Sequence, residues 1–541
     1  MEDSKTFKIF NWIVPIGVVL IFILIELIVR IFVPPDKLSE IALGPLTMFE
    51  KVKKEDGTWY RITGKYNITN NNFEFKEKPD PEVYRIIILG GSAAAGWPHP
   101  SDQTFSFYLE KTLNNINTNK KIEVINCAAH GFASYRVLQV FKEVKNWHPN
   151  LIIVWSGNNE FLEERNINDN QIIQLLRKIG LKIRIVQVLN KMFFPPTKLG
   201  TDIDVAGTFW KKTRQEALTL RTDNKKFASV RKIYSESIGE IAKEAKDENI
   251  QMLLMTVPVN LRDWQPNVSA LKGSEMDSIN WHKHYVNGRG KMLLQNYEDA
   301  ITELKLASDL QPEHAETWFW LARAYENMGD YINAYKCYDQ ARGFDMNPFR
   351  ALGAFNDSIR SLAKHFNVSL FDAETTLKKH SKNGIPGFDM FIDYVHPSKN
   401  GNLTLCYYAA GQIVNFPEFS SNTGINSIAS ELTKISRDGY HDEYDIQLQI
   451  TRFSLCCVNH QDHSVVSIGK HLLEIAPPEV INDKNPESVI PEIKAGVDAF
   501  KSKIEADNYE FINGEIPIKK REMANKKLDT FFNTYYPYGT F

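Results

Sequence analysis

The sequence predicts an α/β fold in which a parallel sheet lies between layers of helices, a flavodoxin-like three-layer sandwich. Short runs of aliphatic and β-branched residues recur along the chain, and turn residues follow them. Helical sequence separates these runs, as right-handed crossovers between parallel strands require. The predicted strands are 83–89, 122–126, 151–155, 251–257 and 368–371.

The composition is that of a folded protein with several domains. A chain of 541 residues exceeds one ordinary core, and 43% hydrophobic and 24% charged residues are typical of packed domains. The net charge of -2 gives no overall field for nucleic acid, so we expect no nucleic-acid partner. Five cysteines without a CxxC spacing predict neither a disulfide framework nor a zinc site. We expect Cys456 and Cys457 to be buried thiols rather than a redox pair.

The N-terminus predicts a membrane anchor over residues 1–34. The run from Ile9 to Val29 is almost wholly apolar, and as a helix it spans about 31 Å, the thickness of a bilayer core. The alternative is a cleaved signal peptide, but the run is long for one and no small-x-small cleavage site follows. Basic residues flank both sides, so orientation rests on a weak signal. We expect a single-pass protein with its body outside the cytoplasm, in the periplasm or at the cell surface.

Spacing along the chain divides the predicted sheet domain into two parts. Residues 35–82 read as a linker, and the domain occupies 83–270 and 350–419. A helical insertion at 164–226 is too long for one crossover. Within it, the segment 172–194 mixes apolar and basic residues, which predicts either a helix packed on the domain or an interfacial lid at the bilayer.

Residues 281–348 predict two tetratricopeptide repeats inserted before the last strand. Tyr297 and Tyr331 are separated by the 34-residue period of this repeat. About three repeats are needed for independent stability, so these helices should lean on the rest of the protein. Their concave surface predicts a protein partner. The second unit carries the signature in Trp318, Leu321, Ala322, Tyr325, Gly329, Tyr331, Ala334, Tyr338 and Ala341.

Residues 420–541 carry no recognisable motif. Segments 489–506 and 519–535 have the pattern of amphipathic helices. We interpret the region as a helical extension that covers the core, with a partner-binding tail as the alternative.

Ser92 is the candidate nucleophile. It follows Gly90 and Gly91 at the end of the first strand and begins a helix, so amide N–H groups surround it at the mouth of the sheet. Taken alone, a Gly-Gly-Ser turn is more typical of a plain helix N-cap. Asp393, three residues before His396, supplies the rest of a triad, because a carboxylate at that spacing orients the imidazole toward a nucleophile.

Two further strand ends carry candidate oxyanion donors. Gly131 offers a backbone N–H and Asn159 a side-chain amide, and with the N–H of Ser92 they predict an oxyanion hole. Taken singly, glycine and asparagine are also ordinary turn residues. Asn260 and Arg262 follow the fourth strand and are candidate substrate contacts, or else residues of a loop that caps the sheet.

The four blocks together resemble the SGNH (GDSL-like) hydrolase superfamily. The blocks are Gly-Gly-Ser92, Gly131, Gly-Asn-Asn159-Glu and Asp393-x-x-His396, in that order. The resemblance covers roughly 83–260 and 350–415 and implies a Ser-His-Asp esterase with the roles given above. It departs from the family where Gly91 replaces Asp and Glu160 replaces Asp, and both departures leave the substrate subclass open.

Other chemistries find less support in the sequence. The glycine-rich turn does not fit GxGxxG and no P-loop lysine follows, so nucleotide binding is not predicted. The GxSxG elbow of α/β-hydrolases is absent. No HExxH or clustered His/Cys set occurs, so we predict no metal and no cofactor. His99 and His130 lie near strand ends and are structural residues or pocket-lining ones.

The functional hypothesis is a membrane-anchored esterase that forms an acyl-Ser92 intermediate on an ester of a glycan or lipid at the cell envelope. Two alternatives stay open. One is an acyltransferase that moves an O-acetyl group to an envelope glycan through the same triad. The other is a scaffold, in which the hydrolase fold is a platform for the repeats.

Overall fold

The computed structural model describes residues 17, 20–31, 49–63, 74–116, 120–162, 183, 185, 218–219, 221–419, 425–438, 442–475 and 486–536. The chain divides into two compact units, residues 1–47 with 165–205 and residues 48–164 with 206–541. The candidate site lies wholly in the second.

The first unit bears on the predicted anchor. Residues 20–31 are helical. In the described part of the chain, no helix combines the length and the apolar character needed to cross a bilayer. Residues 9–16 of the predicted anchor lie outside the described residues, as does nearly all of the predicted helix 172–194.

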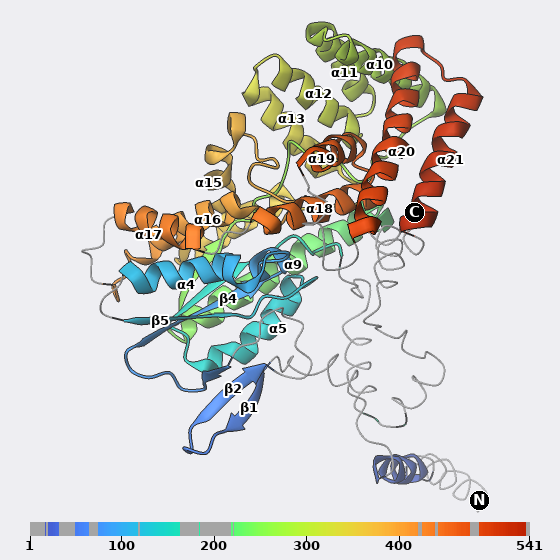
Figure 1. Ribbon diagram of the computed structural model, residues 1–541. Coiled ribbons are helices and arrows are strands. Elements are labelled where there is room, and N and C mark those ends of the chain that lie inside the picture. The colour runs from blue at the N-terminus through green and yellow to red at the C-terminus, as the bar shows by residue number, and fades with distance from the viewer. Residues whose placement is uncertain are drawn as a thin grey trace, which may run out of the picture. The chain divides into compact units, whose positions relative to one another are not determined.

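The second unit is built on a five-stranded parallel sheet with the order β5-β4-β6-β7-β8 (Figure 1). In chain order this is 2-1-3-4-5, the flavodoxin-like arrangement, so the predicted parallel sheet is confirmed. The order changes direction at β4, which pairs with both β5 and β6 and so opens a crevice at its carboxyl end. The strands are β4 (Val83–Gly90), β5 (Lys121–Asn126), β6 (Leu151–Trp155), β7 (Gln251–Met255) and β8 (Ser369–Phe371).

Helices cover the sheet and make its central strands fully buried. Every residue of β6 is buried, as are the last seven of β4. This explains why both strands read as unbroken apolar runs rather than alternating ones. Helix α4 packs with α16, while α5 packs with α9 and α9 with α14. These helices are α4 (Phe105–Ile116), α5 (Ser134–Val144), α9 (Asn224–Asp247), α14 (Gly353–Phe366) and α16 (Lys399–Ile413).

The segment expected to be a linker contains a small sheet of its own. Strands β1 (Phe49–Lys53), β2 (Trp59–Thr63) and β3 (Glu74–Lys76) form an antiparallel sheet in the order β1-β2-β3. Gly57, with φ +83°, lies in the turn between β1 and β2, a conformation that glycine adopts without strain. The aromatic and polar alternation of this segment therefore marks strands rather than a connection.

Four consecutive helices form the insertion before β8, and we call them the inserted helices. They are α10 (Glu275–Leu293), α11 (Tyr297–Leu310), α12 (Ala315–Asn327) and α13 (Tyr331–Phe344), and each packs against the next. Each begins at a side-chain cap, namely Ser274, Asn296, His314 and Asp330. The first helix begins at 275, before the expected 281. The assignment to two tetratricopeptide repeats stays a prediction.

The C-terminal region is helical, and it packs against the inserted helices through α10 and α20 (Figure 1). Cys456 and Cys457 are both buried in α18, within the described part of the chain. The helices are α17 (Ile425–Asp438), α18 (Asp442–Val458), α19 (Asp462–Ile475), α20 (Pro486–Asn513) and α21 (Ile518–Tyr535).

Candidate active site

Ser92 lies at the carboxyl end of the central strand β4. It begins the four-residue helix α3 (Ser92–Ala95), whose N-cap is Gly91. A Cβ atom at Gly91 would lie 2.4 Å from the amide nitrogen of Asn159, so only glycine allows this approach. The glycine that departs from the Gly-Asp-Ser pattern thus lets Asn159 lie directly against the turn that carries the nucleophile.

Asp393 and His396 lie in a bent loop rather than on a helical turn. An isolated bridge between Phe391 and Pro397 closes the loop. Asp393 is fully buried, and its Oδ1 atom accepts the backbone N–H groups of Val395 and His396, each at 2.8 Å. Its other oxygen, Oδ2, is 2.6 Å from His396 Nδ1. The carboxylate therefore fixes both the backbone of the loop and the ring that follows.

The loop brings the imidazole to the serine. His396 Nε2 is 2.7 Å from Ser92 Oγ, although the two residues are 304 positions apart. Because Nδ1 faces the Asp393 carboxylate, Nε2 is the nitrogen free to accept the hydroxyl proton. The three predicted residues thus form a continuous serine, histidine and carboxylate row at the crevice of the sheet.

Aromatic and histidine rings surround the imidazole. The ring of Trp97 meets that of His396 edge-on, with 4.5 Å between centroids. His99 Nε2 is 2.8 Å from the carbonyl oxygen of Pro397, which ties the loop to the segment after the nucleophile. Burial, with a smaller contribution from nearby His396, lowers the pKa of His130 to about 4. His130 is therefore neutral at physiological pH and adds no positive charge beside the His396 ring.

Asn159, a candidate oxyanion donor, lies beside the turn that carries Ser92. Its amide nitrogen lies against Gly91 and donates to the carbonyl of Phe132 at 3.0 Å. That bond uses one of two amide hydrogens and also fixes the orientation of the group. Gly131 has φ +72°, and a Cβ atom there would meet nothing within 4 Å, so its backbone borders open space.

Glu160, the second departure from the family pattern, is a structural residue. Its side chain is fully buried, and its two oxygens accept the N–H of Ser134 at 2.7 Å and the hydroxyl of the same residue at 2.9 Å. Ser134 begins α5, so the carboxylate satisfies an amide at a helix N-terminus. The residue after Asn159 therefore anchors the third strand end to the helix behind it.

Asn260 and Arg262, the candidate substrate contacts, both have polar partners within the protein. Asn260 is fully buried, donates to the carbonyl of Asp393 at 2.9 Å and accepts from the N–H of Asp263 at 3.0 Å. The guanidinium of Arg262 is paired with Asp263 at 3.1 Å and Asp389 at 2.7 Å. Both side chains brace the loop that carries the triad, because their polar groups are already used within the protein.

Arg452, from the C-terminal helix α18, is a residue that sequence reasoning missed. It donates to the carbonyls of Ile392 at 2.7 Å and Phe391 at 2.8 Å, directly before Asp393. Burial lowers the pKa of this guanidinium, and the charge of Asp393 opposes that shift. The only arginine of α18, followed by a mostly apolar run, was the available signal, but the sequence does not reveal which carbonyls it meets.

The described residues contain no group of three or more histidine, cysteine, aspartate or glutamate side chains arranged to hold a metal ion.

Comparisons with known proteins give solved structures of low sequence identity and low TM-score. No family model matches the chain, and no curated protein matches it. An acetyl xylan esterase shares 13% identity with TM-score 0.27, over 60% of this chain and 98% of that one. An acetylxylan esterase from Geobacillus stearothermophilus shares 12% with TM-score 0.28, over 63% and 97%. A GDSL-like lipase from Bacteroides thetaiotaomicron shares 12% with TM-score 0.25, over 62% and 91%.

Proposed function

We propose that the protein is a serine ester hydrolase with Ser92 as nucleophile, His396 as general base and Asp393 as the residue that orients the base. One observation carries the proposal. Oγ of Ser92, both ring nitrogens of His396 and Oδ2 of Asp393 form an unbroken row with spacings of 2.7 and 2.6 Å. Both spacings lie within the range for proton transfer between a nucleophile and its base.

The first half of the reaction forms an acyl-enzyme. His396 Nε2 takes the proton of Ser92 as Oγ bonds to the ester carbonyl carbon. Negative charge then develops on the carbonyl oxygen, where the Asn159 amide and the N–H groups of Ser92 and Gly131 are the proposed donors. When the tetrahedral intermediate collapses, the C–O bond to the alcohol breaks. The protonated imidazole returns its proton to the leaving oxygen.

The second half releases the acid. Water gives a proton to His396 Nε2 as its oxygen attacks the acyl carbon, and the proton then passes to Ser92 Oγ as the acyl-oxygen bond breaks. Asp393 Oδ2 holds the Nδ1 side of the ring and stabilises the imidazolium that forms twice in the cycle. The substrate we propose is an acyl ester on a glycan or lipid.

The location of this chemistry is a separate proposal. The apolar run from Ile9 to Val29 supports anchoring in a membrane, with the body of the chain outside the cytoplasm. We also propose that the inserted helices bind a protein partner on their concave surface. Carbonate extraction of membranes from the native source tests the anchor, because an anchored chain stays in the pellet and a peripheral one is released.

Hydrolysis of p-nitrophenyl acetate tests the activity. We expect turnover by the full chain and a loss of at least about 10³-fold in Ser92→Ala, because residual rates then depend on the oxyanion donors alone. Ser229→Ala, at a half-buried serine on α9 outside the candidate site, is the matched control and should keep full activity. Equal rates for wild type and Ser92→Ala would refute the proposal.

A further inference from the structure

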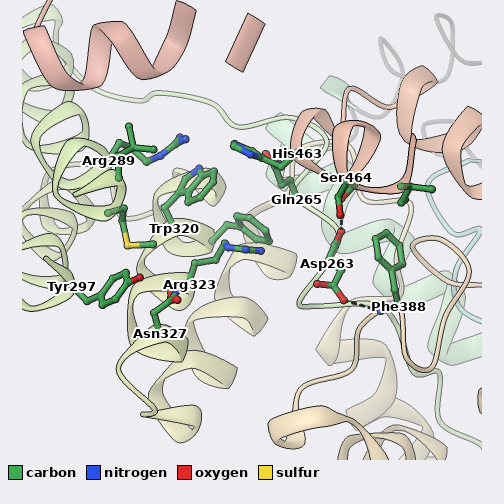
Figure 2. A pocket seen from close by; sticks show the side chains of 15 residues that line it. Asp263, Gln265, Arg289, Tyr297, Trp320, Arg323, Asn327, Phe388, His463 and Ser464 are labelled. Atoms are coloured by element: carbon green, nitrogen blue, oxygen red, sulfur yellow. Dashed lines mark hydrogen bonds between the residues drawn. The ribbon is translucent and has the colours of Figure 1, made fainter. Parts of the chain in front are cut away.

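A cavity separate from the triad residues lies between the inserted helices, α19 and the segment that follows β7 (Figure 2). Its volume of about 410 Å³ falls at the lower end of the range for small-molecule sites. It therefore suits a small ligand or a short stretch of a polymer, rather than the surface of a folded protein. Side chains on both walls point toward the space between them, as Figure 2 shows.

The wall formed by the inserted helices carries two arginines in different states. The Arg289 guanidinium is buried, lies 3.5 Å from the Trp320 ring centre and has Glu316 at 3.6 Å. Arg323 is half-buried and lines the cavity one turn after Trp320 in α12. Among the described residues, no carboxylate lies within 4.0 Å of the Arg323 guanidinium and no hydrogen bond uses it. This wall thus presents one uncompensated positive charge to the cavity.

The opposite wall is polar and belongs to the hydrolase part of the chain. It presents Asp263, the side-chain amide of Gln265 and the ring of Phe388. Guanidinium, carboxylate and amide groups form directional hydrogen bonds with hydroxyl groups, and an acyl chain of a lipid satisfies none of them. The mixture of such groups with aromatic rings therefore favours a sugar over a lipid.

The polar wall is joined to the triad by three hydrogen bonds. Phe388 N–H donates to Asp263 Oδ2 at 2.8 Å, and Asp263 N–H donates to Asn260 Oδ1 at 3.0 Å. Asn260 Nδ2 in turn donates to the carbonyl of Asp393 at 2.9 Å. A ligand that contacts Asp263 or Phe388 therefore touches the same bonded unit that holds the catalytic carboxylate.

We propose that this cavity binds a short stretch of an acidic glycan, with the carboxylate of a uronic acid paired to Arg323 and sugar hydroxyls bonded to Asp263 and Gln265. The identity of the substrate rests on the proposed ester hydrolysis. Together, the two proposals make the substrate an acylated acidic glycan rather than a lipid. The binding site itself does not depend on whether Ser92 is catalytic.

Calorimetric titration of the full chain carrying Ser92→Ala tests the site without turnover. The probes are the trisaccharides of galacturonate, mannuronate and glucuronate, with neutral cellotriose as the uncharged comparison. We expect at least one uronate to bind, and roughly tenfold or more weaker binding in Arg323→Gln, because one charge-assisted pair is lost. Arg231→Gln, an exposed arginine on α9, should leave binding unchanged. Cellotriose should bind more weakly than the uronate and respond little to Arg323→Gln.

Several results would overturn the site. These are no binding by any uronate, equal binding by Arg323→Gln and the parent, or tighter binding of cellotriose than of the uronates. Failure here leaves the esterase proposal standing, since hydrolysis of p-nitrophenyl acetate does not need the cavity. Conversely, a chain that binds uronates but never hydrolyses esters keeps the site and loses the proposed function.

Discussion

A buried arginine secures each end of the parallel sheet, and the two differ in what they hold. At the amino end, Arg85 of β4 is fully buried and donates to the carbonyls of Lys76 and Trp147, each at 2.6 Å, while Glu123 neutralises its charge. At the carboxyl end, Arg452 donates to two carbonyls of the loop that carries Asp393. The same kind of bond is used at both ends.

The hydrogen bonds of Arg85 and Arg452 lead to different parts of the molecule. The contacts of Arg85 tie β4 to the end of β3 and to the segment that follows α5, so they join elements of the fold. The contacts of Arg452 lead through Asp393 and His396 to the hydroxyl of Ser92, which is only half-buried. The two buried arginines therefore differ in role: Arg85 supports the stability of the fold, and Arg452 supports the geometry of the proposed triad. Substitutions at each end should therefore separate stability from rate.

The largest effect on rate is expected from Asp393→Asn. An amide in place of Oδ2 presents a donor to His396 Nδ1 and favours the wrong tautomer, so kcat/KM should fall about 10³- to 10⁴-fold. Asp389→Asn is the matched control, because Asp389 lies just before the same loop and pairs with Arg262 rather than with His396. It should keep most of the activity. Comparable losses in both variants would show that the loop needs carboxylates only for its fold.

At the amino end we expect loss of stability without loss of rate. Arg85→Gln leaves carbonyls and Glu123 without their donor, so the free energy of unfolding should fall by about 3 to 4 kcal/mol. Urea unfolding measures this free energy, and Arg231→Gln, at an exposed arginine, is the control. The folded variant should keep its kcat on p-nitrophenyl acetate. A selective fall in kcat at unchanged stability would contradict the division between the two ends.

The Asn159 side chain tests the oxyanion site at the carboxyl end. Asn159→Ala removes a donor beside the nucleophile turn, and kcat should fall about 10²- to 10³-fold with little change in KM. Asn158→Ala is the neighbouring control. Its side chain accepts from the N–H of Ala351 at 3.0 Å, so it should cost stability and spare kcat. If Asn158→Ala lowers kcat as much, Asn159 is no oxyanion donor.

Arg452→Gln should lower the rate less than Asp393→Asn or Asn159→Ala. Freed carbonyls let the loop shift, and we expect kcat to fall roughly 10- to 100-fold. Arg452→Lys keeps a donor at this position and should recover part of the rate. A variant of lower stability with unchanged kcat would show that Arg452 supports only the fold.

Sequence reasoning was most successful where local chemistry determines structure. The strands at 83–89 and 151–155 are unbroken apolar runs, and both lie buried in the sheet as expected. Ser92 and His396 were found because parallel strands end at one edge and because Asp393 precedes the histidine by three residues. These signals are short and independent of the distant chain.

Features that depend on distant parts of the chain could not be predicted. Asn260 lies at a strand end like a substrate contact, yet its partner is a carbonyl 133 residues away. Arg452 reaches carbonyls 60 and 61 residues earlier in the chain. Tertiary packing decides both cases, and no local pattern records it. The sheet formed by β1 to β3 is different, because its aromatic and polar alternation is present in the sequence but its strands are only three to five residues long.

A fluorophosphonate that reacts only with activated serines gives the most direct test of the central claim. After reaction with the full chain and proteolysis, mass spectrometry should find one phosphonylated serine, Ser92. Labelling should disappear in His396→Ala, because the hydroxyl then has no base. An unlabelled wild-type chain, or equal labelling with and without the imidazole, would contradict the account.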